Sequence, residues 1–327
     1  MNKVSIDFFA KAHFLSDLKC SPDGKKVVFT ECQSTNEGYF KRLMILQDGK
    51  IRPLTDRGVS SFVWLNNEDI IFTSGSRANQ KKGEPFDDHD ELLLIHTSFG
   101  EARPCLEVPL NVGEMISAGE DRLVVKARVM KDCPDYAMLS ETERADVRAK
   151  RKEEDDYRVI TETPFVLDGA GFIEGTRSRL FLIDLKKGQW TPLTAPLDHI
   201  HQFAVKGNKL VYAGKEIKVN RSVLDGLYLM DLESMTTDCL IEPGQWDISD
   251  LGWQKDNIIF FASDQKRYGV TENHKGYIYD LNERTVRCWL DTELSMGSSG
   301  VMSDVVYSSG KKMLIQDEEI LDRKSVV

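Results

Sequence analysis

Three stretches of the chain share one pattern: RLFLIDLKKGQW at 179–190, GLYLMDLESMTTD at 226–238 and GYIYDLNERTVRCW at 276–289. In each stretch an apolar, β-prone run ends in an Asp-Leu pair, a polar turn follows, and a second run leaves the turn. Two earlier stretches follow a looser version of the pattern, LMILQDGKIRPLT at 43–55 and LLLIHTSFGEARPCL at 92–106. β-Prone runs joined by a short polar turn indicate hairpins. We therefore predict five hairpins of this kind.

A second kind of turn precedes each of these hairpins. Asn, Asp and Gly supply the backbone conformations that hairpin turns require, and the Val, Ile and Phe residues that follow favour strands. Six copies of this turn occur, at 22–25, 66–69, 119–121, 206–208, 255–257 and 309–311. Because the two kinds of turn alternate along the chain, the repeating unit contains four strands.

The spacing of these units predicts the architecture. Setting aside about 15 N-terminal residues and an insertion of about 40 leaves roughly 270 residues, or five to six units of about 50. Such repeats are typical of β-propellers, because one four-stranded sheet cannot bury both of its faces alone. We predict an all-β fold: a short helical segment at 1–15, then a β-propeller of four-stranded antiparallel blades at 16–327. It would have five full blades and part of a sixth.

The unusually long interval between the third and fourth turns contains an insertion at about 132–160. Ser140 and Glu143 have capping-box spacing, and residues 141–154 include neither Pro nor Gly, so a helix is expected there. Its side chains are almost all polar, and Arg144, Arg148 and Lys152 are spaced to repel one another. We interpret this stretch as a helical insertion in the third blade, outside the core.

The last unit is shorter than the others, because no second hairpin follows the one expected at 302–316. A propeller that stops there exposes a strand edge and an apolar sheet face. We therefore expect the chain to be a truncated part of a longer protein. We also expect self-association of the isolated chain, through the apolar side of the N-terminal segment that carries Val4, Phe8 and Leu15.

Composition excludes several classes of function. The chain has 43 Lys and Arg against 53 Asp and Glu, a net charge of −10, which argues against nucleic-acid binding. No apolar run approaches the roughly 18 residues of a membrane span, and Asp7 and Lys11 interrupt the N-terminus where a signal peptide is apolar. The six cysteines lack a C-x-x-C pair, so free thiols are expected. We predict a cytoplasmic protein with no cofactor and no membrane partner.

Two stretches resemble a known family. IDFFAKAHFLSDLKCSPDGKKVVFT at 6–30 and YRVITETPFVLDGAGFIEGTRSRLFLIDLKKGQWTPLT at 157–194 are similar to parts of the prolyl oligopeptidase superfamily of serine peptidases. The resemblance is strongest to its acylaminoacyl-peptidase and dipeptidyl-peptidase-like branch. Ser21 to Gly24 match the first-blade turn, and Gly169 and Gly171 lie in the matching third-blade loop. The resemblance covers essentially the whole chain and corresponds to the N-terminal propeller portion of those enzymes.

The resemblance implies a function. In that family the propeller covers the mouth of an α/β-hydrolase domain, restricts entry to small peptides, and is followed by a nucleophile in a G-x-S-x-G motif. This chain lacks the motif, since Gly297 to Gly300 is one residue short, and we interpret that stretch as a turn. We therefore expect no catalytic residue and no catalytic domain here. The expected partners are peptide substrates and the missing C-terminal hydrolase domain; the alternative is a free-standing propeller that binds a protein or peptide.

Glu153 and Glu154 are the substrate-binding residues that the resemblance suggests. Related dipeptidyl peptidases hold the substrate's α-ammonium group with acidic side chains delivered by a propeller excursion, and two carboxylates can bind one ammonium through charge-assisted hydrogen bonds. The alternative is a solvated run of charges, because Lys150 to Lys152 lie alongside.

Two further clusters could hold a metal ion. His199 and His201 lie two residues apart before an apolar strand, so their imidazoles could share a sheet face with Asp198. Polar residues at a strand start are the favoured interpretation, because spacing supplies no further ligand. The acidic run 87–91 lacks the D-x-D-x-D-G spacing of calcium loops, so a solvated loop is favoured there. We predict no metal site.

Overall fold

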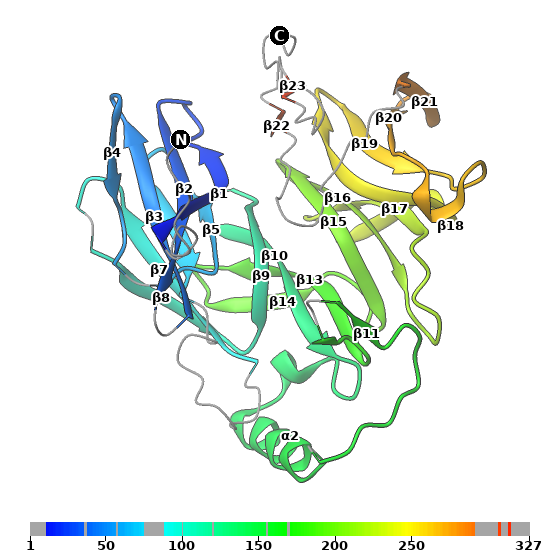
Figure 1. Ribbon diagram of the computed structural model, residues 1–327, viewed down its shortest axis with the longest axis horizontal. Coiled ribbons are helices and arrows are strands. Elements are labelled where there is room, and N and C mark those ends of the chain that lie inside the picture. The colour runs from blue at the N-terminus through cyan, green and yellow to red at the C-terminus, as the bar shows by residue number, and fades with distance from the viewer. Residues whose placement is uncertain are drawn as a thin grey trace, which may run out of the picture. The chain divides into compact units, whose positions relative to one another are not determined.

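The computed structural model describes residues 11–35, 38–56, 58–74, 88–99, 101–119, 121–154, 156–168, 171–291, 307–308 and 313–314. Most of these residues form strands, and α2 (Glu141–Glu153) is the longest helix among them (Figure 1). The fold is therefore all-β and propeller-like, with a helical excursion.

The chain divides into two compact units. Unit 1 consists of Met1–Val129, Asp135–Arg158 and Phe181–Thr191, and unit 2 consists of Met130–Pro134, Val159–Leu180 and Pro192–Val327. No helix of the described residues is both long and apolar enough to cross a membrane.

Unit 1 contains two four-stranded antiparallel sheets in which sequence neighbours pair in order. The first sheet consists of β1 (His13–Cys20), β2 (Lys26–Thr35), β3 (Gly38–Gln47) and β4 (Lys50–Pro53). The second consists of β5 (Ser61–Trp64), β6 (Asp69–Thr73), β7 (Asp90–His96) and β8 (Arg103–Val108).

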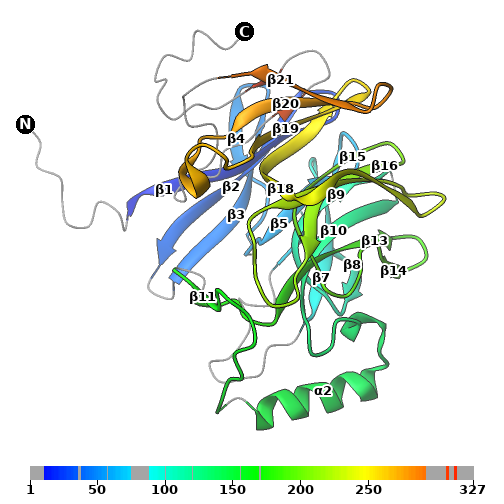
Figure 2. The ribbon, with the colours of Figure 1, turned by 90° about the vertical axis from the view of Figure 1, so that its right-hand side faces the viewer.

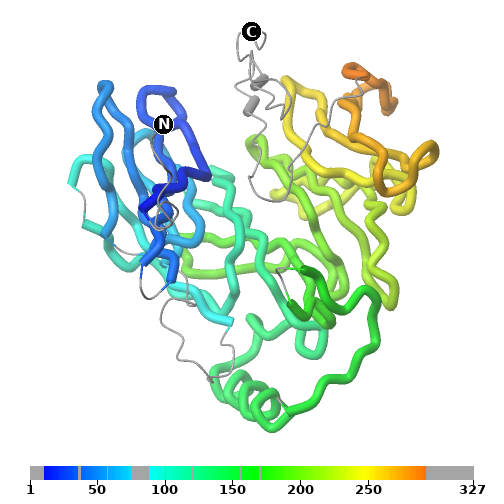
Figure 3. The backbone as a smooth tube through the Cα atoms, viewed as in Figure 1, coloured from blue at the N-terminus to red at the C-terminus, as the bar shows by residue number. Residues whose placement is uncertain are grey.

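A third sheet has the strand order β14-β13-β10-β9. Its strands are β9 (Asn111–Ser117), β10 (Arg122–Met130), β13 (Thr176–Asp184) and β14 (Gln189–Pro192). Between β10 and β13 the chain leaves the sheet, along the green part of the tube in Figure 3. This excursion forms a short 3-10 helix, α2 and a small hairpin of β11 (Val166–Leu167) and β12 (Gly171–Phe172). The helix expected at 141–154 is therefore present, and the excursion runs past the predicted bound of residue 160 to include this hairpin.

Unit 2 also contains a seven-stranded antiparallel sheet in chain order. Its strands are β15 (Asp198–Lys206), β16 (Lys209–Glu216), β17 (Asp225–Asp231), β18 (Thr236–Gln254), β19 (Asn257–Ser263), β20 (Lys275–Asp280) and β21 (Thr285–Leu290). The 19-residue strand β18 pairs with β17 along its first part and with β19 along its second. Two four-stranded sections thus share one long strand.

The predicted hairpins are present. All five Asp-Leu-type turns lie between paired antiparallel strands, and so do the first five turns of the other kind. Strands β22 (Tyr307–Ser308) and β23 (Met313–Leu314) pair on either side of the sixth, whose own residues lie outside the described set. The Asp-Leu aspartates act as turn caps, since Asp231 Oδ1 accepts hydrogen bonds from the backbone N–H groups of Glu233 and Ser234, at 2.9 and 2.8 Å.

Strand β6 is buried on both of its faces, so its sheet must have a neighbour on each side. Ile70, Ile71 and Phe72 are consecutive, so their side chains alternate between faces, yet all three are fully buried. Ile70 and Phe72 pack with Val28 of the first sheet, whereas Ile71 belongs to a separate core with residues of the third. A strand buried on both faces must lie within a stack of sheets, as in a propeller.

The N-terminal prediction needs one correction. β1 begins at His13, where Phe14 pairs with Cys32 and Leu15 with Glu31, so the predicted helical segment does not extend to residue 15. Pairing with β2 overrides helical spacing in these three residues. Residues 1–10, which include Val4 and Phe8 of the predicted apolar stripe, lie outside the described residues, as do the predicted turn at Gly297 to Gly300 and Gly169 of the third-blade loop.

Candidate functional site

The predicted substrate-binding pair lies at the C-terminal end of α2, a helix outside the sheets of its unit (Figure 2). Both Glu153 and Glu154 are exposed to solvent. Glu154 is the C-cap residue, and its backbone N–H donates to the Lys150 carbonyl oxygen at 3.1 Å. The structure does not place the carboxylates of Glu153 and Glu154 beside any other predicted site residue among those it describes. Their role in binding an ammonium group stays a prediction.

The acidic run at 87–91 is divided among separate partners. Asp88 forms an ion pair with Arg151 of α2, with 3.3 Å between Oδ2 and Nη1. Asp90 accepts a hydrogen bond from the Val112 backbone N–H at 2.7 Å. Both aspartates are buried, and Asp87 lies outside the described residues. The predicted solvated loop is therefore wrong for these two aspartates, which serve as internal hydrogen-bond acceptors.

His199 and His201 do lie together, as the spacing suggested. Their ring centroids are 5.1 Å apart with the rings nearly perpendicular. The register of β15 against β16 shifts between Ile200 and Gln202, so His201 is the extra residue of a β-bulge. Asp198 takes no part in the pair, because its Oδ2 accepts from the Ala195 backbone N–H at 2.8 Å. The described residues include no group of three side chains able to hold a metal ion.

Gly214 permits this close arrangement of β15 and β16. A Cβ atom at this position would lie 2.6 Å from the His199 carbonyl oxygen and 2.7 Å from Ile200 Cδ1. Real Cβ atoms do not approach backbone oxygens so closely, so only glycine fits without a shift of the strand.

Each imidazole has a fixed hydrogen-bond partner. His199 Nδ1 accepts from the Ser178 backbone N–H at 3.2 Å, which leaves the ring proton of the neutral form on Nε2. Burial lowers the pKa of His199 to about 3, and the neighbouring charges of His201 and Arg221 act in the same direction. His199 is therefore neutral at physiological pH.

Asp225 organises the second histidine. Its Oδ2 lies 2.7 Å from His201 Nδ1 and its Oδ1 lies 2.6 Å from Lys215 Nζ, while its own side chain is fully buried. A buried carboxylate bonded to Nδ1 fixes the ring orientation and turns Nε2 away from the carboxylate. His201 is about one-third exposed, so it is the part of this cluster that solvent reaches.

A second buried cluster surrounds Glu162, which sequence analysis did not single out. Glu162 accepts from Arg177 Nη2 at 2.6 Å and from Lys131 Nζ at 3.0 Å, and Arg221 Nη2 lies 3.2 Å away. Arg177 Nη2 also donates to the Ile217 carbonyl oxygen at 2.8 Å. Glu162 and Arg177 are both inaccessible to solvent. The cluster therefore joins the segment before β11 to β13 and to the loop after β16.

Glu162 stays ionised despite its burial. Burial by itself raises the pKa of a carboxyl group, but hydrogen bonds from Arg177 and Lys131 outweigh it and lower the pKa of Glu162 to about 2. Because protein cations surround this carboxylate, the cluster holds unit 2 together rather than offering an open ammonium site.

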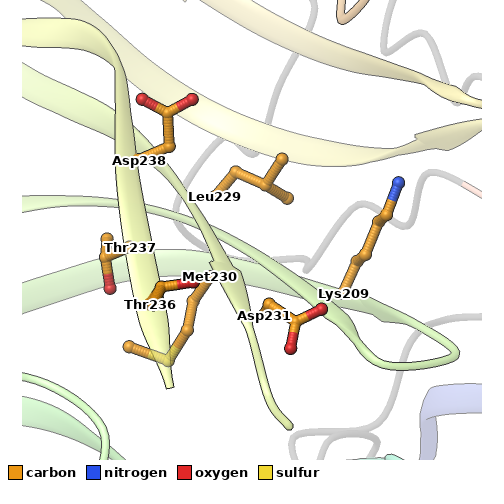
Figure 4. A pocket seen from close by; sticks show the side chains of 7 residues that line it. All are labelled: Lys209, Leu229, Met230, Asp231, Thr236, Thr237 and Asp238. Atoms are coloured by element: carbon orange, nitrogen blue, oxygen red, sulfur yellow. The ribbon is translucent and has the colours of Figure 1, made fainter. Parts of the chain in front are cut away.

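A surface pocket of about 370 Å³ lies on the β17–β18 hairpin of unit 2 (Figure 4). It is lined by Lys209, Leu229, Met230, Asp231, Thr236, Thr237 and Asp238. Its two carboxylates already have partners: Asp231 caps its turn, and Asp238 binds Arg284 through both oxygens at 2.8 and 3.1 Å. The pocket therefore offers no unengaged carboxylate to a ligand.

Comparison with known proteins gives a fold likeness. No family model matches the chain, and no curated protein matches it by sequence. Among solved structures, acylaminoacyl peptidase from Pyrococcus horikoshii superposes with a TM-score of 0.59 at 17% identity, over 86% of this chain and 40% of that chain. The chain therefore spans well under half the length of that peptidase.

Two other structures are similar over most of this chain. The β-propeller domain of the Trilobed protease from Pyrococcus furiosus matches with a TM-score of 0.56 at 14% identity, over 95% of this chain and 79% of that one. An oligogalacturonate lyase in complex with manganese matches with a TM-score of 0.55 at 13% identity, over 92% and 70%. The resemblance predicted from the sequence is thus confirmed as a shared propeller-like fold.

Proposed function

We propose that the chain is the substrate-gating β-propeller portion of a serine-type oligopeptidase, or of an aminoacyl or dipeptidyl peptidase. The observation that carries the proposal is the match to acylaminoacyl peptidase, which uses 86% of this chain but only 40% of that one. A propeller-like fold that corresponds to a minor part of a peptidase is suited to controlling access to a catalytic domain. Peptide substrates and an α/β-hydrolase domain are then its partners.

The strand pattern supports a count of blades in this proposal. Three four-stranded sheets and the two sections that share β18 make five blades, and the β22–β23 pair begins a sixth. The α2 excursion leaves the third blade between β10 and β13. Catalysis belongs to the hydrolase domain, while the propeller selects peptides by size.

An active-site probe on the native protein tests the proposal. An antibody against residues 11–291 would isolate the native polypeptide, which is then treated with a fluorescent fluorophosphonate that labels reactive serines. We expect one labelled polypeptide, longer than 327 residues, that carries both the antibody epitope and the fluorophore. An unlabelled polypeptide of about this chain's length, with no labelled partner, would reject the proposal.

A free-standing propeller that binds a protein or peptide is the second candidate. It is favoured by the match that covers 70% of the oligogalacturonate lyase, because the remaining part of that chain is too small for a large additional domain. The unlabelled outcome of the same experiment would support this candidate.

A further inference from the structure

Helix α2 is held on its unit by arginine side chains rather than by apolar burial. None of its residues is buried. Arg144 donates to the Leu139 carbonyl oxygen at 2.8 Å, and Arg148 donates to the Tyr136 hydroxyl oxygen at 2.9 Å. Docking that depends on a few polar contacts costs little to reverse compared with burial of an apolar helix face.

Arg151 makes the most enclosed of these contacts. Its guanidinium pairs with Asp88 at 3.3 Å, and its Cζ lies 5.4 Å from the centre of the Tyr136 ring. Only 6% of the Asp88 side chain is exposed, and Tyr136 is 2% exposed. A carboxylate beside an aromatic face is the combination that binds a guanidinium group, through ion pairing and cation–π attraction together.

The insertion pivots at Leu139, and the segments before and after this residue are stabilised by contacts that do not involve Arg151. Ala137 belongs to an apolar core of unit 1, and its carbonyl oxygen accepts from Trp190 Nε1 at 2.8 Å. At the start of α2, Ser140 and Glu143 form the predicted capping box from their own side chains. The helix can therefore keep its N-terminal cap while it moves about the stem at Leu139.

We propose that Asp88 and Tyr136 form a guanidinium-binding site, which Arg151 fills from within the chain and which an arginine side chain of another peptide occupies when α2 lifts. Arg148 donates to the Tyr136 hydroxyl oxygen, and its Nη2 lies 2.7 Å from Glu141 Oε1, a carboxylate that it shares with Arg144. Asp88 is the carboxylate that pairs with Arg151, so it is the anion that attracts the guest. The inference concerns α2 and unit 1 and holds whichever function the chain has.

Hydrogen exchange tests whether Arg151 holds the helix. In the Arg151→Ala variant we expect amides of 141–153 to exchange at least about tenfold faster, since the helix loses its hydrogen-bonded ion pair with Asp88. Lys150→Ala, an exposed neighbour, is the matched control and should leave exchange unchanged. Amides of β10 report the fold and should be unaffected in both variants. Equal exchange in Arg151→Ala and wild type, or faster exchange that includes β10, would overturn the proposal.

A ligand pair tests the site itself. N-acetylarginine amide is titrated into the Arg151→Ala variant labelled with ¹³C-tyrosine, and the Tyr136 signal is assigned by loss in Tyr136→Phe. We expect N-acetylarginine amide to shift that signal saturably at millimolar amide concentrations. The isosteric but neutral N-acetylcitrulline amide should cause no shift. Neither amide should shift the signal when Asp88→Asn is combined with Arg151→Ala. Equal responses to the two amides, or no response to either, would refute the guanidinium site.

Discussion

At the scale of single residues, the polar interior of unit 2 depends on charges that satisfy one another. Glu162 meets Arg177 and Lys131, and Asp225 meets Lys215 and His201. Buried ion pairs are costly to break, because the remaining partner keeps its desolvation penalty without compensation. These residues therefore control stability more than they provide an open binding site.

Glu162→Gln tests the larger cluster. The variant keeps the size of the side chain but leaves the buried Arg177 without its counter-charge, so we expect the free energy of unfolding to fall by roughly 3–5 kcal/mol. Denaturant unfolding followed by tryptophan fluorescence measures this. Glu216→Gln, which removes an exposed pair with Lys218, should change stability by under about 1 kcal/mol. Equal small effects of both substitutions would show that the cluster contributes nothing.

The lowered pKa of His199 predicts that the stability of the chain depends on pH. Its pKa is about 3 in the folded chain but near 6.5 in an unfolded one, so between these values the unfolded state binds a proton that the folded state does not. Stability should therefore decrease as pH falls from about 6.5 to 3. His199→Gln, which keeps an acceptor for the Ser178 N–H group, should weaken this decrease in unfolding free energy. An unchanged pH profile would argue against a neutral, half-buried His199.

At the scale of elements, the hairpin turns could be predicted because their chemistry is local. Asp, Asn and Gly fix the turns, and β-prone runs on either side fix the strands. The bulge at His201 could not be predicted, because it depends on the register of β15 against β16. The β11–β12 hairpin could not be predicted either, because its strands of two residues each are too short to show a β pattern. The sequence also could not identify Glu162 or Asp225, since their partners come from segments that spacing does not relate. Asp225 does leave one weak signal, a carboxylate at the start of an apolar strand.

Gly214→Ala tests the tight pairing of β15 and β16. The added methyl group would press on the His199 carbonyl oxygen at 2.6 Å, so we expect a loss of about 1–3 kcal/mol in unfolding free energy. Gly252→Ala in β18 is the matched control, because its Cβ would meet nothing closer than Ile259 Cγ1 at 3.9 Å. Thermal or denaturant unfolding measures the stability of the two variants. Equal losses of stability would contradict the close approach of position 214 to the His199 carbonyl oxygen.

At the scale of the whole molecule, the period of the repeat predicted the all-β, propeller-like fold, and the structural matches support it over 86% to 95% of the chain. Strand β6, buried on both faces, shows why such sheets occur in series. Function was harder to infer, because a propeller-like fold serves unrelated activities and the sequence offers no catalytic motif to choose among them.

The isolated chain should be inactive as a peptidase. The sequence has no G-x-S-x-G motif, so residues 1–327 are expected to hydrolyse aminoacyl and peptidyl chromogenic substrates no faster than buffer does. Turnover that a serine-directed phosphonate abolishes would contradict this expectation.

Size selection by the native protein tests the central claim, that this propeller gates a peptidase. The measurement compares kcat/KM of the native polypeptide for a short peptide and for a long unfolded polypeptide with the same cleavage sequence. A gate admits the short peptide and excludes the long one, so the account predicts cleavage of the short substrate alone. Cleavage of both substrates with equal kcat/KM would contradict it.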